Sequence, residues 1–338
     1  MRVARIGFPV AGALVAAVAL AGLTRPAAEP ASTPSPSPVA TAGTTPAPSP
    51  AKRAIVIQAT GDVSLDPSYI PDFRERGYAW AWSGLGGAFR QDDLTIVNLE
   101  CPATTIVAPL EKRFVFRCDP AALPAMRRAG VEVANQANNH ALDQGTEGLL
   151  DSIEQVRAAG ITPVGAGVDE AAAIAPALLE VGGWRIAVVG LGQVLDPLWQ
   201  VAGAETPGTA AGHDVEEMLR GIRAADAVAD LVVVVIHWGV ELDTEPRDWQ
   251  VEQAARMVEA GADMIFGHHS HRLQPLGTVG GRPVFYGLGN FVWPRFSAAG
   301  ARTAIARVEV APDGTLTASL VPVTIVSNGH PVPDGGVW

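Results

Sequence analysis

The chain has 338 residues, of which 48% are hydrophobic and 17% charged, and its formal net charge at pH 7 is −11. This length and composition predict well-packed globular structure, as one large domain or two small ones. The acidic balance and the lack of a long basic run in the sequence exclude nucleic acid as an expected partner, because phosphate binding requires a clustered positive field.

The first 23 residues predict a signal peptide or an N-terminal anchor. Arg2 and Arg5 precede an apolar run from Ile6 to Leu23, and the small residues of "ALA" at 19–21 fit a signal-peptidase site. An apolar run of about 18 residues can also hold a chain in a bilayer. Both interpretations predict an exported protein, secreted or anchored at the cell surface, that meets the membrane only through this segment.

Residues 24–53 are rich in Pro, Ser, Thr and Ala and almost lack large apolar side chains. Such a segment cannot bury enough surface to offset its ordering entropy, so we expect an extended linker. The folded domain is expected to span residues 54–330.

From residue 54 onward, strand-like and helix-like segments alternate. Apolar runs that end in polar residues predict strands, some continuing into loops, within 54–62, 94–100, 131–140, 184–192, 231–239 and 262–271. Amphipathic patterns predict helices at 121–130, 145–160, 214–230 and 248–261, and Gly-containing turns predict hairpins within 273–293 and 303–325. This order predicts an α/β fold with mixed sheets and helices outside them.

Polar residues gather where the predicted strands end. Since ligand sites of α/β sheets form at the carboxyl ends of the strands, we expect one shared site there. Carboxylate, amide and imidazole groups together suit a divalent metal such as Mn, Zn or Fe, whereas Ca would favour oxygen ligands alone. The alternative is that each residue has a local role, such as a helix cap, a turn or an exposed loop histidine. The residues are Asp62, Glu100, Asn139, His140, His237, His269 and His271.

The segment "GHHSH" at 267–271 supplies three histidines. The two-residue spacing of His269 and His271 would place both rings on one side of an extended loop. Glu100 could bridge two cations, and a two-metal site stabilises the attacking and leaving oxygens of a displacement. His140 could then act as a general acid instead of a ligand.

Two further groups lie near these motifs. Cys101 and Cys118 can form a disulfide in an exported protein, or remain as two buried thiols. Arg113 and Arg117, with Lys112, form a local basic cluster that can bind a substrate carboxylate or phosphate, or can simply be solvated charges.

Three acidic residues, Asp143, Glu241 and Asp243, follow the histidine motifs. They can orient imidazoles or lie on the surface.

Six motifs in order resemble those of the CapA (PGA-cap) family, which is named for poly-γ-glutamate capsule synthesis. They are "TGDVSLD" (60–66), "IVNLECPAT" (96–104), "ANNHALDQG" (137–145), "HWGVE" (237–241), "GADMIFGHHSHRLQP" (261–275) and "VFYGLGNFVW" (284–293). The resemblance implies a four-layer αββα sandwich of the metallophosphatase-like type, shared with calcineurin-type phosphoesterases and 5′-nucleotidases.

The same resemblance implies roles for single residues. Asp62, Glu100, Asn139, His237, His269 and His271 resemble metal ligands for one or two ions, and His140 resembles the general acid. His268 is an extra neighbour of the ligand pair. Ser64 stands where the metallophosphatase motif Asp-x-His has its histidine, so one ligand of the first metal is absent.

The expected function is the synthesis or processing of poly-γ-glutamate or a related surface polymer, by a metal-dependent hydrolase or transferase. One alternative is a metal-dependent phosphoesterase, and another is a non-catalytic protein that binds the polymer or supports its synthase. The expected partner is therefore an acidic cell-surface polymer or its membrane synthase.

Overall fold

The computed structural model describes residues 51–194 and 200–335. The predicted signal peptide or anchor and nearly all of the predicted linker lie outside the described residues. The first strand, β1 (Ile55–Val63), begins one residue after the predicted start of the domain. The last strand, β16 (His330–Pro333), continues past the predicted end at residue 330. In the described part of the chain, no helix combines the length and apolar character that crossing a membrane requires.

Two mixed sheets carry the fold. In spatial order, the eight-stranded sheet contains β16, β15 (Leu316–Ser327), β14 (Arg302–Val310), β1, β2 (Leu94–Leu99), β3 (Val133–Asn135) and β4 (Thr162–Val164), and β13 (Asn290–Val292) pairs with the end of β1. The six-stranded sheet contains β11 (Leu276–Val279), β12 (Arg282–Phe285), β10 (Met264–His268), β9 (Leu231–His237), β7 (Trp184–Gly192) and β6 (Ala177–Val181). A small third sheet pairs β5 (Ala166–Gly167) with β8 (Gly208–Thr209).

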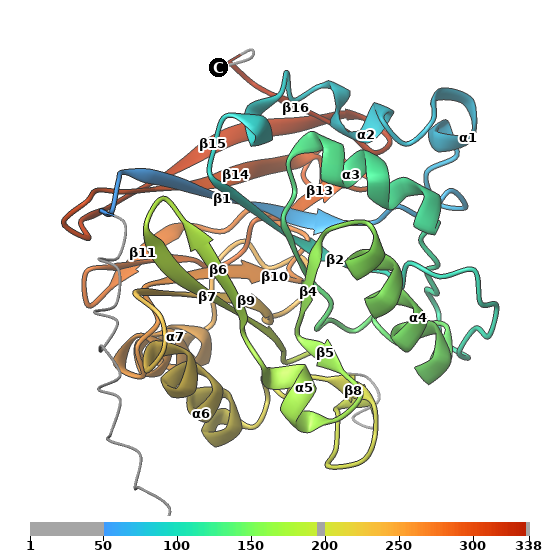
Figure 1. The fold of residues 1–338 in the computed structure, drawn as a ribbon. Coiled ribbons are helices and arrows are strands. Elements are labelled where there is room, and N and C mark those ends of the chain that lie inside the picture. Colours follow the sequence, from blue (N-terminus) through green and yellow to red (C-terminus); the bar gives the residue numbers. More distant parts are fainter. Residues whose placement is uncertain (1–50, 195–199, 336–338) are drawn as a thin grey trace, which may run out of the picture. The chain divides into compact units, whose positions relative to one another are not determined.

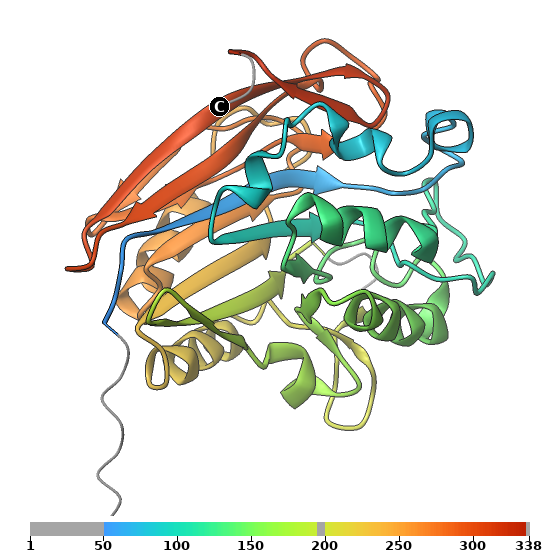
Figure 2. The same cartoon turned by 45° about the horizontal axis from the view of Figure 1, so that its top comes forward.

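Helices lie on the outer sides of the two large sheets, as Figures 1 and 2 show. On the side of the eight-stranded sheet lie α1 (Asp72–Arg76), α2 (Trp80–Ser83), α3 (Leu123–Ala129), α4 (Gly145–Ala158) and the 3₁₀ turns η1 (Ala88–Arg90) and η2 (Pro120–Ala122). On the side of the six-stranded sheet lie α6 (Val215–Asp226) and α7 (Asp248–Glu259), and α5 (Glu170–Ile174) packs against β5.

The alternation of side chains along each strand explains the continuous apolar runs of the sequence. In β9, Val233 and Val235 face the core between the sheets, whereas Val234 packs outward against the core under α6 and α7. In β2, Ile96 faces inward and Val97 faces the helices on the opposite side. Because both faces of each sheet are covered, both sets of side chains must be apolar. The predicted four-layer αββα sandwich is therefore confirmed.

The late hairpins differ in one respect from the prediction. Residues 303–325 form the expected antiparallel pair β14 and β15, and β11 and β12 turn at Gly280 and Gly281 as expected. The end of the predicted hairpin at 273–293 instead crosses to the other sheet, where β13 runs parallel to β1. This crossing brings the "GLGN" motif next to the "TGD" motif.

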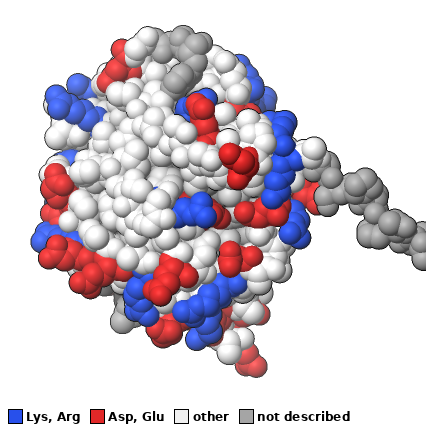
Figure 3. All heavy atoms as spheres, turned by 90° about the vertical axis from the view of Figure 1, so that its left-hand side faces the viewer, with Lys and Arg blue, Asp and Glu red and all other residues white. Residues whose placement is uncertain are grey.

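Charges of both signs are interspersed on the face shown in Figure 3, which is the left-hand side of Figure 1. Acidic and basic side chains surround an area of neutral residues there, without a continuous basic field among the residues in view. This face therefore lacks the positive track that nucleic-acid binding requires.

Candidate metal centre

Four polar residues lie level with one another at the edge of the eight-stranded sheet: Asn290 of β13, Asp62 of β1, Asn98 of β2 and Asn135 of β3. We call them the polar row. Asn98 is fully buried, and its Nδ2 group donates to Asp62 Oδ1 at 2.9 Å and lies 3.1 Å from His237 Nδ1 in the other sheet. Its Oδ1 atom accepts a hydrogen bond from Asn135 Nδ2 at 3.0 Å. Asn98 therefore links the two sheets, although no sequence signal distinguished it.

A close approach of two chain segments positions Asp62. Its backbone N–H donates to the carbonyl of Gly289 at 2.9 Å. A Cβ atom on Gly61 would lie 2.2 Å from that same carbonyl oxygen, so this position admits only glycine without a backbone shift. The glycines of the two motifs thus let β1 and the segment before β13 meet.

The histidines come from the edge of the six-stranded sheet. His237 ends β9, level with His268 at the end of the parallel neighbour β10. His269 and His271 follow with φ angles of 84° and 50°, in the left-handed region that costs a non-glycine residue about 1–3 kcal/mol. Left-handed backbone, and not the expected extended loop, therefore places their ring centroids 6.0 Å apart.

His268 is buried but takes no part in the cluster of possible ligands. Its Nε2 atom lies 2.8 Å from the carbonyl oxygen of Thr60 in β1 and donates to it. This bond ties the end of β10 to the other sheet.

The structure brings the predicted ligands together between the two sheet edges. His237 Nε2 lies 2.8 Å from Asn139 Oδ1, 3.1 Å from His269 Nδ1 and 3.5 Å from Glu100 Oε1. The possible ligands form two groups, and within each group the donor atoms lie within 4.8 Å of one another. One group contains Glu100, His269 and His271, and the other contains Asp62, Glu100 and His237, so Glu100 belongs to both. A carboxylate common to both groups is what bridging two cations requires.

Of the two buried carboxylates at this centre, Asp62 is partly compensated by Asn98 and His271, whereas Glu100 is not. Both are fully buried, and neither oxygen of Glu100 has a hydrogen-bond partner among the described residues. Asp62 Oδ2 has only the ring of His271, at 3.1 Å. Burial raises the pKa of Glu100 well above its usual value, and the charges of Asp62 and Glu241 raise it further. A divalent cation would compensate these charges, so the donor set fits such an ion.

Burial also keeps two imidazoles neutral. It lowers the pKa of His237 well below its usual value, and neighbouring His269 lowers it further. Burial likewise lowers the pKa of His269 to about 3. Each ring is therefore uncharged at neutral pH and does not repel a cation.

Asn290 orients the third imidazole. Its Nδ2 group donates to the Gly300 carbonyl at 3.0 Å, which points Oδ1 toward His271 Nδ1 at 2.9 Å. Since an amide oxygen only accepts, Nδ1 carries the proton and Nε2 faces Glu100 at 3.8 Å. Burial lowers the pKa of His271, but the hydrogen bond and charge of Asp62 outweigh it and leave this pKa above its usual value.

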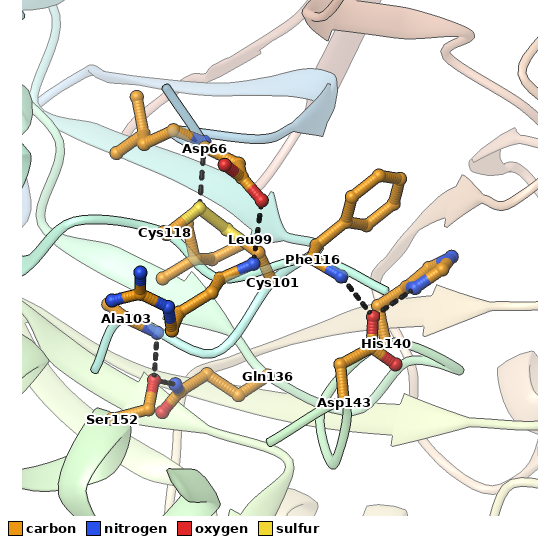
Figure 4. Close-up of a disulfide and its surroundings, with 12 residues drawn as sticks. Asp66, Leu99, Cys101, Ala103, Phe116, Cys118, Gln136, His140, Asp143 and Ser152 are labelled. Atoms are coloured by element: carbon orange, nitrogen blue, oxygen red, sulfur yellow. Dashed lines mark hydrogen bonds and ion pairs between the residues drawn. A yellow bond between two sulfur atoms is a disulfide. The ribbon is translucent and has the colours of Figure 1, made fainter. Parts of the chain in front are cut away.

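A cavity of about 240 Å³ opens beside the centre and is lined by His140 and His271 among others. We call it the site cavity. His140 Nδ1 lies 2.7 Å from Asp143 Oδ2, which also accepts a bond from the Phe116 N–H at 2.6 Å (Figure 4). Lys112 Nζ lies 2.6 Å from Asp143 Oδ1 and donates to the Asn139 carbonyl at 2.7 Å. Asp143 is thus a buried partner of the imidazole and not a surface acid.

A disulfide joins Cys101 and Cys118, whose Cα atoms lie 5.6 Å apart (Figure 4). Cys101 follows Glu100 directly, and the backbone N–H of Leu65, in the "TGDVSLD" motif, donates to Cys118 Sγ at 2.8 Å. The bridge therefore fastens the segment after β2 to the segment that carries Phe116.

The structure does not bring the two predicted substrate-binding arginines to the site cavity. Side chains of an extended segment alternate in direction, and here Phe114 and Phe116 line the site cavity while Arg117 lines a separate hollow of about 360 Å³. The Arg113 guanidinium lies over the ring of Phe114, 5.0 Å from its centroid, and does not line the cavity.

Ser64, the position of the missing motif histidine, is buried. Its hydroxyl has no hydrogen-bond partner among the described residues, and its N–H donates to the Val292 carbonyl at 2.8 Å. The group that contains Asp62 therefore has one imidazole fewer than the motif Asp-x-His would supply.

A solved structure with a similar fold is "Structure of Haemophilus influenzae NAD nucleotidase (NadN)", with a TM-score of 0.52 and 15% identity. The similarity covers 84% of this chain and 59% of that chain. At this identity the similarity concerns the fold alone, and it confirms the metallophosphatase-like architecture.

Sequence comparison finds closer relatives. The chain is 32% identical over 240 residues to "PGA biosynthesis protein CapA" of Bacillus subtilis (strain 168), covering 70% of this chain and 63% of that protein. It is 35% identical over 216 residues to "Capsule biosynthesis protein CapA" of Bacillus anthracis, covering 62% and 51%. It is 32% identical over 231 residues to "Probable polyglutamine synthesis accessory protein Rv0574c" of Mycobacterium tuberculosis (strain ATCC 25618 / H37Rv), covering 64% and 60%.

The chain thus spans between half and two thirds of the length of these relatives. Residues 56–295, which include every candidate ligand, match the family described as "Bacterial capsule synthesis protein PGA_cap". This match covers most of the chain, and the chain belongs to that family.

Proposed function

We propose that this protein acts in the synthesis or processing of poly-γ-glutamate, or of a related acidic surface polymer, through a divalent-metal centre. Family membership and the names of the relatives support the polymer. The observation that carries the metal centre is the fully buried Glu100, which lies beside Asp62 and three imidazoles and whose two oxygens have no hydrogen-bond partner among the described residues. An uncompensated buried carboxylate of this kind is costly for a fold to keep unless a cation completes the site.

The residues proposed to hold the ion are Asp62, Glu100, Asn139, His237, His269 and His271. Mn, Zn and Fe are the ions that suit this mixture of donors, in a number of one or two. When bound, such an ion polarises a carbonyl or phosphoryl oxygen and lowers the pKa of water. Because Ser64 replaces an imidazole, we expect the group containing Asp62 and His237 to bind its ion more weakly than the group containing His269 and His271.

His140 is proposed to exchange a proton with the bound group. Asp143 accepts the Nδ1 proton, so Nε2 is the atom left to face the site cavity. In its protonated form this atom gives a proton to a leaving nitrogen or oxygen. Lys112 and the Phe116 N–H hold Asp143 in place, so the imidazole has a defined orientation.

We further propose that the domain works outside the cytoplasm. The apolar run at residues 6–23 and the Pro-rich segment after it support export and a spacer between the membrane and the fold. The disulfide is also in keeping with an oxidising compartment. A membrane synthase of the polymer would then be a partner, as the word "accessory" in the name of one relative suggests for that protein.

The proposal is tested by elemental analysis and turnover with the purified full chain. Three proteins are incubated with Mn, Zn or Fe and then freed of unbound ion: wild type, the double variant His269→Ala/His271→Ala and the control His213→Ala. His213 is exposed and lies outside the centre. We expect wild type and His213→Ala to retain metal and the double variant to lose it, whereas a metal-free wild type would refute the centre.

Each protein is then given poly-γ-glutamate and p-nitrophenyl phosphate esters. Shortening or transfer of the polymer that depends on metal supports the proposed enzyme. Turnover of the esters with the polymer intact would favour a phosphoesterase, for which the NadN-like fold is a reason. Binding of the polymer without any turnover would favour the non-catalytic accessory role, for which the absence of a histidine at Ser64 is a reason.

A further inference from the structure

The site cavity is small and has an apolar mouth. Its volume of about 240 Å³ lies below the roughly 300–1,000 Å³ of ordinary ligand pockets, so it admits one unit of a polymer instead of a run of several. Three large apolar side chains at the mouth are exposed, Phe114 by 45%, Leu242 by 59% and Phe296 by 73%. Exposed apolar side chains grouped at a hollow mark a surface that a ligand covers.

Arg272 places an uncompensated positive charge on the cavity wall. Its Nη1 atom donates to the His271 carbonyl at 2.7 Å, and no described carboxylate forms an ion pair with it. A Cβ atom on Gly300 would lie 3.2 Å from the same Nη1, so glycine leaves room for the guanidinium there. The remaining N–H groups of Arg272 are suited to a carboxylate, which they can bind in a bidentate manner.

Glu241 brings the opposite charge to the same cavity. It is exposed, it lines the cavity with Arg272, and it forms no ion pair with a described lysine or arginine. Its position beyond the end of β9 lies four residues from His237. A ligand that satisfies both side chains must carry an anionic and a cationic group within the span of one small cavity.

We infer that the site cavity binds the free amino end of a γ-glutamyl chain, with the α-carboxylate on Arg272 and the α-ammonium on Glu241. This inference rests on the proposed function. Only the terminal unit of a γ-linked chain has both groups free, because the α-nitrogen of every internal unit is acylated by its neighbour. The two side-chain methylenes of that unit suit the apolar mouth, and the γ-carbonyl then points toward the metal centre.

The test is calorimetric binding of two tripeptides to the full chain: γ-glutamyl-γ-glutamyl-glutamate with a free amino end and the same peptide N-acetylated. Both the L and D forms are used. We expect wild type to bind the free peptide at least tenfold more tightly, since acetylation removes the charge that Glu241 recognises. Glu241→Gln should abolish this discrimination, and Arg272→Gln should lower the affinity for both peptides at least tenfold.

Matched controls are Glu245→Gln and Arg295→Gln, which remove the same charges nearby without lining the cavity. Both should bind as wild type does. Because Arg272 bonds the backbone of His271, the metal content of each variant is measured, and Arg272→Lys, which keeps the charge and a donor, should recover part of the affinity.

Four results would overturn the inference. Equal affinity of wild type for the two peptides would refute recognition of the amino end, as would unchanged discrimination in Glu241→Gln. Binding of long poly-γ-glutamate without binding of either peptide would show that the cavity takes internal units, and the proposed function would stand. Failure to bind peptides and polymer alike would remove the proposed function together with the inference.

Discussion

Glu100→Gln is expected to change stability in opposite directions with and without metal. The substitution keeps the size of the side chain and removes a fully buried charge whose oxygens have no hydrogen-bond partner in the described part of the chain. Removing such an unsatisfied charge should raise the free energy of unfolding by about 1–3 kcal/mol. An unfolding entropy of about 2.1 cal/mol/K per residue over roughly 280 folded residues gives about 0.6 kcal/mol per degree, so the metal-free variant should melt about 2–5 °C above metal-free wild type.

With metal, the order should reverse. An ion present at 100 times its dissociation constant stabilises wild type by about 2.7 kcal/mol, which is about 4–5 °C for a fold of this size. Glu100→Gln should lose most of that gain, because Glu100 belongs to both groups of possible ligands. Melting curves recorded in a chelator and in Mn, Zn or Fe measure both effects. The control is Glu154→Gln, which changes an exposed residue and should melt as wild type does.

A variant that melts below wild type in the chelator, yet keeps the full gain in metal, would refute this reasoning. Such a result would mean that Glu100 stabilises the fold through bonds of its own and does not bind the ion. A wild type whose melting temperature is the same in chelator and in every ion would refute the metal centre itself.

Three other predictions concern single features of the structure. Replacing Cys101 and Cys118 by Ser should lower the free energy of unfolding by about 3 kcal/mol, because the loop closed by the disulfide is entropically restricted when unfolded; equal urea midpoints would contradict this. His140→Gln should reduce turnover about 10²–10⁴-fold with metal content unchanged, and full activity would exclude a proton-transfer role. Burial raises the pKa of Asp92 to about 7, so ionisation of its carboxyl destabilises the folded state as the pH rises from about 4 to 7. The raised pKa corresponds to about 4 kcal/mol at pH 8, and because Asp92 is partly exposed we expect solvent screening to leave about half of it. Asp92→Asn should therefore be more stable than wild type by about 2 kcal/mol at pH 8 and equally stable at pH 4, and a difference that does not vary with pH would argue against this account.

The predicted ligands could be found from the sequence because of how parallel strands are arranged. Asp62, Glu100 and His237 each end or follow an apolar run, and carboxyl ends of parallel strands meet at one edge. The direction of a side chain on an irregular segment has no such signal. Arg117 points away from the site cavity because it is one residue out of phase with Phe116, and that phase depends on where the disulfide and its neighbours fix the segment.

The left-handed backbone at His269 and His271 could not be predicted either, since nothing in "HHSH" favours it over an extended loop. Such a conformation persists only where surrounding contacts hold it. Here the His271 ring is held by Asn290, and its carbonyl by Arg272. Two residues that the sequence did not mark as ligands thus fix the geometry of one that it did.

The polar row explains why the two sheet edges can form one centre. The amide nitrogen of Asn98 lies within hydrogen-bond distance of Asp62 and of His237, so the positions of a carboxylate and an imidazole from different sheets depend on a single side chain. Its oxygen is fixed in turn by Asn135, which leaves the amide no freedom to flip. An amide can do this without adding charge, whereas a carboxylate at the same position would repel Asp62 and Glu100. The centre therefore depends on neutral amide side chains that fix the positions of its carboxylates and imidazoles. These amides can be recognised only once the strands are aligned.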